Sequence, residues 1–378
     1  MCAGADIHPH VRTLINASND LGFKLLSRLL GADPGQNVFI SSFSVALALA
    51  MTYNGAEGET KEAMARVLGV ESLSLNELNE ANAALISLGQ ELDRDVHVDI
   101  ANSIWVRQGV QPGAGFTTRI EDYYDGKFAS VNFKDPATAD VINRWVASQT
   151  HGRIDQLVTP ALIELAILVL INAIAFRGIW TSQFDDRQTE MRPFALADGS
   201  SKQHPMMSQQ GWYDYFETES LQGIRLPYGD GQVHMVVLMP QPHALLEDFQ
   251  KDLTTENWRR WSRRFVEMEG QVVLPRFRMA YETDLLPVLE EVGGQAIAGT
   301  DFLGMEAGPL FISKVIHKTF VEVDEEGTEA AAATAVVMLR SAARRFRMVV
   351  DRPFFCAVCD DTTGLLLFMG WILDPTSS

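Results

Sequence analysis

One short stretch of small residues constrains the fold of this chain more than any other feature. Residues 325–334 read EEGTEAAAAT, and strand-like runs of apolar and β-branched residues flank them at 311–323 and 346–355. Acidic residues at the start and arginines beyond the end suit the dipole of a helix, and alanine is the best helix former. A surface helix is therefore one interpretation of the stretch.

The same residues also fit a strand. Because side chains alternate along a strand, one face would carry only small uncharged groups, namely Thr328, Ala330, Ala332 and Thr334. That face fits between two existing strands without a steric clash, while Glu329 on the other face stays in water. A segment that can be either an exposed loop or a buried central strand suits a conformational switch.

Composition indicates a soluble globular protein. The chain has 378 residues, of which 47% are hydrophobic and 21% charged, so it can bury a large core. A net charge of −18 argues against nucleic acid as a partner, because nucleic-acid binding needs a basic surface. No apolar stretch reaches the ~18 residues that span a membrane, so we expect no membrane partner. No signal peptide is visible, and the compartment stays open, because a leader can have been removed.

Hydrophobic periodicity predicts helices and strands that do not alternate regularly. Helical spacing covers residues 7–30, 45–53, 61–68, 75–92, 140–157 and 285–292, and the segment 140–157 is expected to close near Gly152. Strand-like runs cover residues 96–106, 168–180, 233–239, 272–279, 354–358 and 365–373. Since no internal repeat or Pro/Gly/Ser-rich linker interrupts the chain, we expect one α+β domain spanning residues 1–378.

The familiar motifs of catalysis and cofactor binding are missing from the sequence. It has no G-x-S-x-G elbow, phosphate-binding loop or metal-spaced Cys/His set, so we expect no cofactor, no metal and no hydrolase site. Cys356 and Cys359 mimic a CxxC redox motif, but the strand-like run 354–358 contains Cys356 and ends just before Cys359, and residues three apart in a strand point to opposite faces. Buried apolar thiols are the favoured interpretation.

A second motif, WRRWSRRF at residues 258–265, allows two interpretations. On a helix, Trp258, Trp261 and Phe265 share one face, and the arginines at 259, 260, 263 and 264 share another. A solvated amphipathic helix has this pattern, and we favour it. A polyanion-binding surface is the alternative.

Several blocks, taken in order along the chain, resemble the serpin family of protease inhibitors. They are residues 37–51 (NVFISSFSVALALAM), 142–154, 170–180, 324–334 and 346–355. Each block alone is weak evidence for the family. So many blocks, in the right order over nearly the whole length, are strong evidence. One departure is Ser42, where the family often has proline. The resemblance implies a fold of three β-sheets and eight or nine helices, with an exposed reactive-centre loop at about residues 325–347.

The resemblance also implies roles for individual residues. A buried polar cluster called the shutter, beneath the place where the main sheet opens, would comprise Ser41, Ser44, Asn172 and His317. A site called the breach, where the loop first enters the sheet, would comprise Trp180, Arg276 and Glu325. The hinge is the start of the loop and would comprise Glu325, Gly327, Thr328, Glu329, Ala330, Ala331, Ala332 and Ala333.

The implied function is inhibition and not catalysis. An inhibitory serpin is a monomer that offers a bait bond to a target protease, here expected to be a serine endopeptidase, and traps it by inserting the cut loop. A cysteine protease target and a non-inhibitory carrier or chaperone remain as alternatives. The bait bond is open: counting from Gly327 favours Ser341, similar sequences favour Arg340, and counting back from Arg352 allows Ala342.

Overall fold

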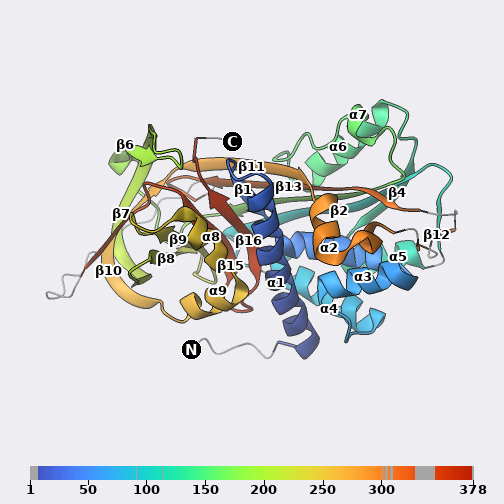
Figure 1. Ribbon diagram of the computed structural model, residues 1–378, viewed down its shortest axis with the longest axis horizontal. Coiled ribbons are helices and arrows are strands. Elements are labelled where there is room, and N and C mark those ends of the chain that lie inside the picture. Colours follow the sequence, from blue (N-terminus) through green and yellow to red (C-terminus); the bar gives the residue numbers. More distant parts are fainter. Residues whose placement is uncertain are drawn as a thin grey trace.

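The computed structural model describes residues 7–90, 92–113, 115–299, 301–302, 305–306, 310–327 and 345–376. Most of the hinge and all three candidate bait residues, Arg340, Ser341 and Ala342, lie outside these ranges. The described part is an α+β fold in which helices pack on both faces of one sheet and against one face of another (Figure 1).

Most of the helices fall within the predicted helical segments, but those at residues 116–124, 160–163 and 246–252 were not predicted. Ten α-helices lie within the described residues, against an expected eight or nine, and the short α7 is a single turn. Their bounds are α1 Pro9–Ala32, α2 Ser42–Tyr53, α3 Gly58–Leu68, α4 Leu75–Gln90, α5 Phe116–Tyr124, α6 Ala137–Gln149, α7 Pro160–Ile163, α8 Leu246–Asp252, α9 Thr255–Ser262 and α10 Leu286–Gly293. Two 3₁₀ turns, η1 Asp186–Gln188 and η2 Gln295–Ala298, complete the helical part that the structure describes.

Three sheets are formed by the described strands, as the resemblance implied. The largest has nine strands in the order β1-β16-β15-β9-β8-β7-β10-β14, with β6 paired to β7. Their bounds are β1 Val38–Ile40, β6 Glu190–Ala195, β7 Ser201–Glu217, β8 Leu221–Tyr228, β9 Val233–Pro240, β10 Val266–Pro275, β14 Phe346–Val349, β15 Phe354–Asp360 and β16 Leu366–Ile372.

The second sheet has five strands in the order β11-β13-β5-β2-β4, and the third pairs β12 with β3. Their bounds are β2 Val96–Arg107, β3 Gln111–Pro112, β4 Lys127–Val131, β5 Leu168–Gly178, β11 Phe277–Asp284, β12 Met305–Glu306 and β13 Ile312–Val323. We call the five-stranded sheet the main sheet.

Alternation along β5 explains why helices cover both faces of the main sheet. Its odd-numbered residues, such as Val169 and Ile171, pack in a cluster with α6, whereas Leu170 and Ile174 join the larger core with α2. Figure 1 shows α6 and α7 above the main sheet and α1 to α5 below it. A strand buried on both faces reads as a continuous apolar run, which is how residues 168–180 appear in the sequence.

Two predicted boundaries were wrong. The strand predicted at 272–279 is two strands, because β10 ends at Pro275 and β11 begins at Phe277 in a different sheet. Arg276 lies between them and joins the two sheets. The helix predicted at 140–157 ends at Gln149, and the chain turns at His151 and Gly152, both with positive φ. A left-handed backbone cannot continue a helix, so the bound at 157 was wrong, whereas the expected closure near Gly152 lies within three residues of the observed end at Gln149.

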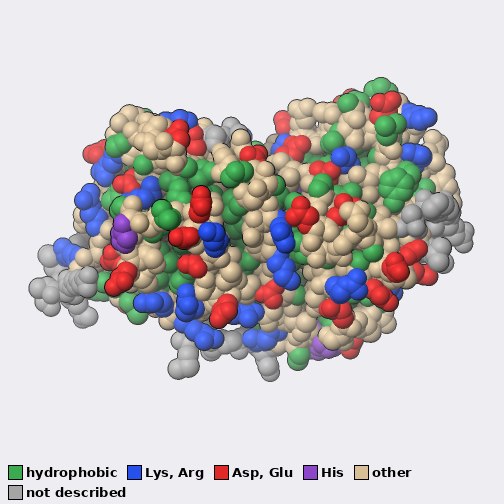
Figure 2. Space-filling view, viewed as in Figure 1, with side chains coloured by type: hydrophobic (Ala, Val, Ile, Leu, Met, Phe, Trp, Pro, Cys, Tyr) green, Lys and Arg blue, Asp and Glu red, His purple; other side chains and the backbone are tan. Residues whose placement is uncertain are grey.

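Two other predictions are confirmed. Cys356 and Cys359 are free and buried, and burial raises the pKa of both thiols, so neither is a poised nucleophile. Helix α9 buries Trp258 and Trp261 and exposes the neighbouring arginines. Figure 2 shows Lys and Arg side chains gathered along the lower left edge of the molecule, near α9. No helix in the described ranges is both long and apolar enough to cross a membrane.

Candidate functional site

The centre of the main sheet is a parallel pair. Strands β5 and β13 are direct neighbours, with Asn172 opposite His317 and Phe176 opposite Val321. Parallel pairs are slightly less stable per residue than antiparallel ones. The chain leaving β13 would run antiparallel to both strands if it turned back between them. The parallel β5–β13 pair, the weaker kind of strand pairing, is thus directly followed in the chain by the segment after β13.

A buried polar cluster lies beneath this pair, and it unites all four residues assigned to the shutter. The Ser41 backbone N–H donates to His317 Nε2 at 3.2 Å, and Asn172 Nδ2 donates to Ser44 Oγ at 2.5 Å. His317 Nδ1 contacts Asn172 Oδ1. Every one of these side chains is fully buried. A complete set of partners allows the polar groups to stay in the core at little cost.

The hydrogen bonds determine the state of His317. Because Nε2 accepts from Ser41, the proton of the neutral ring is on Nδ1 and is donated to Asn172. Burial lowers the pKa of His317 to about 3, and its hydrogen bond with Asn172 acts in the opposite direction. A neutral ring can therefore hold β13, β5 and α2 together throughout the neutral pH range.

Sequence reasoning missed a fifth member, Asn102. Its Oδ1 accepts a 2.5 Å hydrogen bond from Asn172 Nδ2, and β2 places it directly opposite Asn172. Asn102, Asn172 and His317 thus form a row across three neighbouring strands. The available signal was an asparagine inside the strand-like run 96–106, which an apolar core tolerates only with a partner.

Ser42, the departure from the family pattern, begins α2 next to the shutter. Its hydroxyl is buried and has no hydrogen-bond partner among the described residues. Proline is favoured at the first position of a helix, where the backbone N–H has no partner within the helix. The preceding Ser41 is already extended, with φ −116° and ψ 100°, as a residue before proline must be. The chain therefore carries a small local defect here.

The breach residues are also in contact. The Arg276 Nη2 group lies 2.5 and 2.6 Å from the two carboxylate oxygens of Glu325, and Thr189 Oγ1 donates to Glu325 Oε1 at 2.5 Å. The Glu325 side chain is 8% exposed, whereas that of Arg276 is 47% exposed. Burial alone would raise the pKa of Glu325, but the hydrogen bonds from Arg276 and Thr189 hold it below its usual value.

Trp180 holds the backbone at the same point. Its indole Nε1–H donates to the carbonyl oxygen of Asp324 at 2.9 Å, and its ring stacks on Tyr228 with 4.1 Å between centroids. The Trp180 backbone N–H also donates to Glu326 O at 3.1 Å. The end of β13 is thus tied to the segment that follows β5.

Gly327 is the last hinge residue that the structure describes, and two features require glycine there. Its φ is +100°, a conformation that other residues rarely adopt. A Cβ atom at this position would also overlap Gly178 O and Trp180 N. The other hinge residues, Thr328, Glu329 and Ala330 to Ala333, lie outside the described residues.

The chain that follows residue 344 is held at a different place, in the nine-stranded sheet. Phe346 pairs with Gly270 in the parallel β10–β14 ladder, and its ring stacks on Tyr215 at 4.1 Å between centroids with planes 9° apart. A Cβ on Gly270 would overlap the Phe346 ring, so the glycine makes room for it. Tyr213 approaches the same ring edge-on. We call Tyr213, Tyr215, Gly270 and Phe346 the aromatic clamp.

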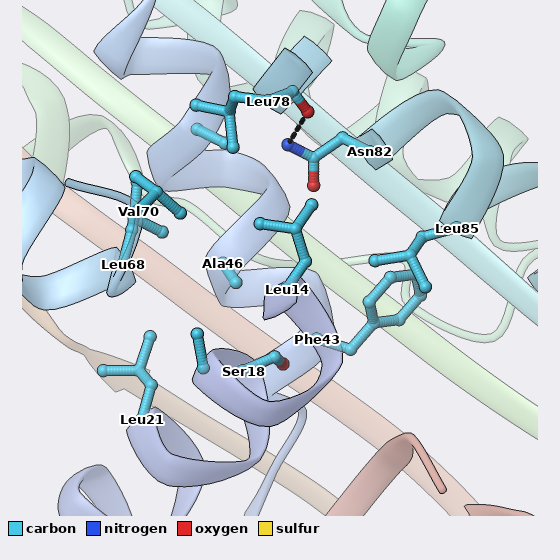
Figure 3. A pocket seen from close by; sticks show the side chains of 12 residues that line it. Leu14, Ser18, Leu21, Phe43, Ala46, Leu68, Val70, Leu78, Asn82 and Leu85 are labelled. Atoms are coloured by element: carbon cyan, nitrogen blue, oxygen red, sulfur yellow. Dashed lines mark hydrogen bonds between the residues drawn. The ribbon is translucent and has the colours of Figure 1, made fainter. Parts of the chain in front are cut away.

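A cavity between α1, α2, α3 and α4 is too small to be a ligand site (Figure 3). Its volume is about 20 Å³, enough for a single water molecule. The hydroxyl of Ser18 lies in its wall without a hydrogen-bond partner among the described residues. In the same ranges, no three His, Cys, Asp or Glu side chains are grouped to hold a metal ion.

Comparison with known proteins identifies the family. The sequence model of Serpin (serine protease inhibitor) matches residues 16–375. The chain is a serpin. Members of this family are generally protease inhibitors and not catalytic enzymes, and a change of conformation is consistent with the fold.

Individual serpins are similar over nearly the full length. Glia-derived nexin of Rattus norvegicus is 32% identical over 96% of this chain and 94% of its own. Serpin B6 of Pongo abelii is 34% identical over 96% of this chain and 99% of its own. The solved structure of native protease nexin-1 with heparin superposes with a TM-score of 0.86 at 30% identity, covering 97% of this chain and all of that chain.

Proposed function

We propose that this serpin is a suicide substrate that traps a serine protease as a covalent acyl-enzyme. The observation that supports the proposal is the parallel β5–β13 pair, in which the two strands are direct neighbours. In the sequence it is followed directly by a hinge whose small residues would share one face of a strand. After attack on the bait bond at Arg340, Ser341 or Ala342, residues from Gly327 onward enter between β5 and β13. The attached protease is carried along and its active site is distorted before water completes hydrolysis.

The proposed roles of the two site regions follow from their contacts. The shutter would hold β5 and β13 together and re-pair after they separate, because its hydrogen bonds join α2 to both strands. The breach would release the first residues of the loop, because Glu325 is held by the side chains of Arg276 and Thr189 and not by strand pairing.

The driving force of insertion is new strand pairing. About a dozen residues would gain sheet hydrogen bonds worth ~0.5–1.5 kcal/mol each, so the total is on the order of 10 kcal/mol. The uncut protein retains this free energy because a barrier, and not the equilibrium, sets its lifetime.

A denaturing gel after incubation with a panel of serine and cysteine proteases tests the mechanism. A stable covalent complex identifies both the mechanism and the class of target. A protease that only cuts the loop, with no complex, would favour a non-inhibitory carrier or chaperone.

Thr328→Arg should convert the inhibitor into a substrate, because insertion would bury an unpaired charge. The matched control is Glu329→Arg, which changes a neighbour on the opposite strand face that already carries a charge. We expect cleavage of both variants, with the covalent complex lost only in Thr328→Arg. Equal trapping by Thr328→Arg and the wild type would contradict strand insertion.

A further inference from the structure

A groove of about 490 Å³ lies beside the aromatic clamp and has no part in the proposed insertion. It runs between the end of β7, the start of β10 and the edge strand β14. Among the residues that line it are the apolar Phe216, the half-buried Met268 and Val266, which is 57% exposed; we call these three residues its apolar floor. An exposed valine on such a floor is surface that a partner could cover.

The rim of the groove is basic although the chain is strongly acidic. It carries Arg264, Arg345 and Arg347 against one acidic residue, Glu217, while the whole chain has a net charge of −18. Arg345 is paired with Glu269 at 2.8 Å. Arg264 and Arg347 are exposed and form no ion pair within the described ranges. Their charges are therefore available to an acidic partner.

The short segment between the bait bond and Arg345 keeps a bound protease near this groove. From a cut after Arg340, five residues lead to Arg345, and an extended chain spans at most about 3.5 Å per residue, or roughly 17 Å. A protease of about 230 residues has a radius of gyration of roughly 17 Å, so its body extends farther than the chain can hold it away. The protease surface beside its active site is therefore within reach of the groove.

We propose that this groove is a docking surface for the target protease, taking an acidic surface segment with an apolar side chain from beside the protease active site. The inference rests on the proposed function and deepens it by naming the class of partner surface. A polyanion would use Arg264 and Arg347 but would leave the Val266 and Met268 floor uncovered. A protein segment fits both the charge and the apolar floor, and charges on the rim mainly set the rate and salt dependence of association.

The test is binding of anionic trypsin and cationic trypsin, each inactivated by replacing its catalytic serine with alanine. The double variant Arg264→Glu with Arg347→Glu is compared with the wild type by surface plasmon resonance at low and high salt. The matched control is Arg28→Glu with Arg66→Glu, which reverses two exposed charges on α1 and α3. We expect the double variant to bind anionic trypsin about tenfold more weakly at low salt, with little change at high salt.

Cationic trypsin should bind the double variant as tightly as the wild type or more tightly, and the control should match the wild type for both enzymes. Unchanged binding of anionic trypsin to the double variant, or no binding to the wild type, overturns the proposal. Heparin binding that the double variant loses, with trypsin binding intact, would assign the groove to a polyanion and also overturn it. Active trypsin tests the function separately: absence of a covalent complex refutes trapping without affecting the docking result.

Discussion

The described residues before 328 and after 344 are anchored by different kinds of contact. At the proximal end, Glu325 is held by Arg276 and Thr189, and Gly327 has no side chain to pack. At the distal end, Phe346 is buried in the aromatic clamp and paired in a ladder. Polar contacts can be replaced by water when they part, but a buried ring loses its whole contact surface. One end is thus suited to leaving its place and the other to staying.

Under the proposed mechanism, this difference would also restrain the uncut loop. An intact loop can insert fully only if β14 leaves the edge of its sheet, because residues 328–344 are attached to it. The aromatic clamp opposes that detachment. Cleavage removes the connection and leaves the clamp in place.

The largest expected effect comes from breaking the distal anchor. Phe346→Ala should remove about 3–5 kcal/mol of packing and so shorten the half-life of inhibitory activity at 37 °C without cleavage. Arg347→Ala, an exposed neighbour on the same strand, is the control and should keep a half-life close to the wild type. A half-life of Phe346→Ala equal to the wild type would show that the clamp does not restrain β14.

Acid should destabilise β13 and the residues just after it more than β14. His317 has its pKa lowered to about 3 in the folded state, against about 6.5 unfolded, so the unfolded state binds more protons between these values. Stability is therefore lost as pH falls below about 6.5, by about 2–3 kcal/mol between pH 6 and pH 4. Glu325, whose pKa is lowered, loses its contribution in the same direction.

Urea unfolding midpoints at pH 4 and pH 6 measure this effect, with hydrogen exchange locating it. His317→Gln should show a smaller loss between the two pH values, whatever its stability at pH 6. Amides of β13 should lose protection in acid before those of β14. Equal pH dependence of His317→Gln and the wild type would remove His317 from the explanation.

The smallest effect is expected at the breach. Arg276→Ala leaves the Glu325 carboxylate with Thr189 as its side-chain partner in the described contacts, and should lower stability by about 1–2 kcal/mol, since Arg276 is half exposed. The control is Arg192→Ala, which removes an exposed pair with Glu190 and should change stability by less than about 0.5 kcal/mol. Thermal melting of both variants, before and after loop cleavage, makes the comparison. An Arg276→Ala protein that melts like Arg192→Ala would mean that the breach pair is an ordinary surface contact.

Much of the fold was predictable because its elements are long and strongly patterned. Residues 168–180 and 233–239 are continuous apolar runs, and α1 shows helical spacing along its length. The change of sheet at Arg276 was not predictable, because residues 272–279 read as one strand. The break arises because β10 pairs with β7 whereas β11 pairs with β13. The short elements α5, α7, α8 and β4 lack an extended pattern and were missed. The longer strands β7 and β8 were not predicted either.

The candidate site also contains residues that the sequence could assign and residues that only the structure reveals. The shutter and breach residues were assigned through resemblance, because nothing in the local sequence brings Ser41 near His317. Asn102 required the strand register, which places it opposite Asn172. The aromatic clamp required the space over Gly270, a property of the assembled sheet and not of either strand.

The parallel pair has a consequence for how the protein folds. Asn172 and His317 are 145 positions apart, whereas a hairpin partner for β13 would come from the residues just after it. Closing the longer loop costs roughly 2 kcal/mol more in chain entropy than closing a ten-residue one. Local pairing is also faster than pairing of distant segments. Under the proposed mechanism, the active form therefore depends on an order of assembly in which β13 meets β5 and α2 before residues 328–334 can fold back onto it.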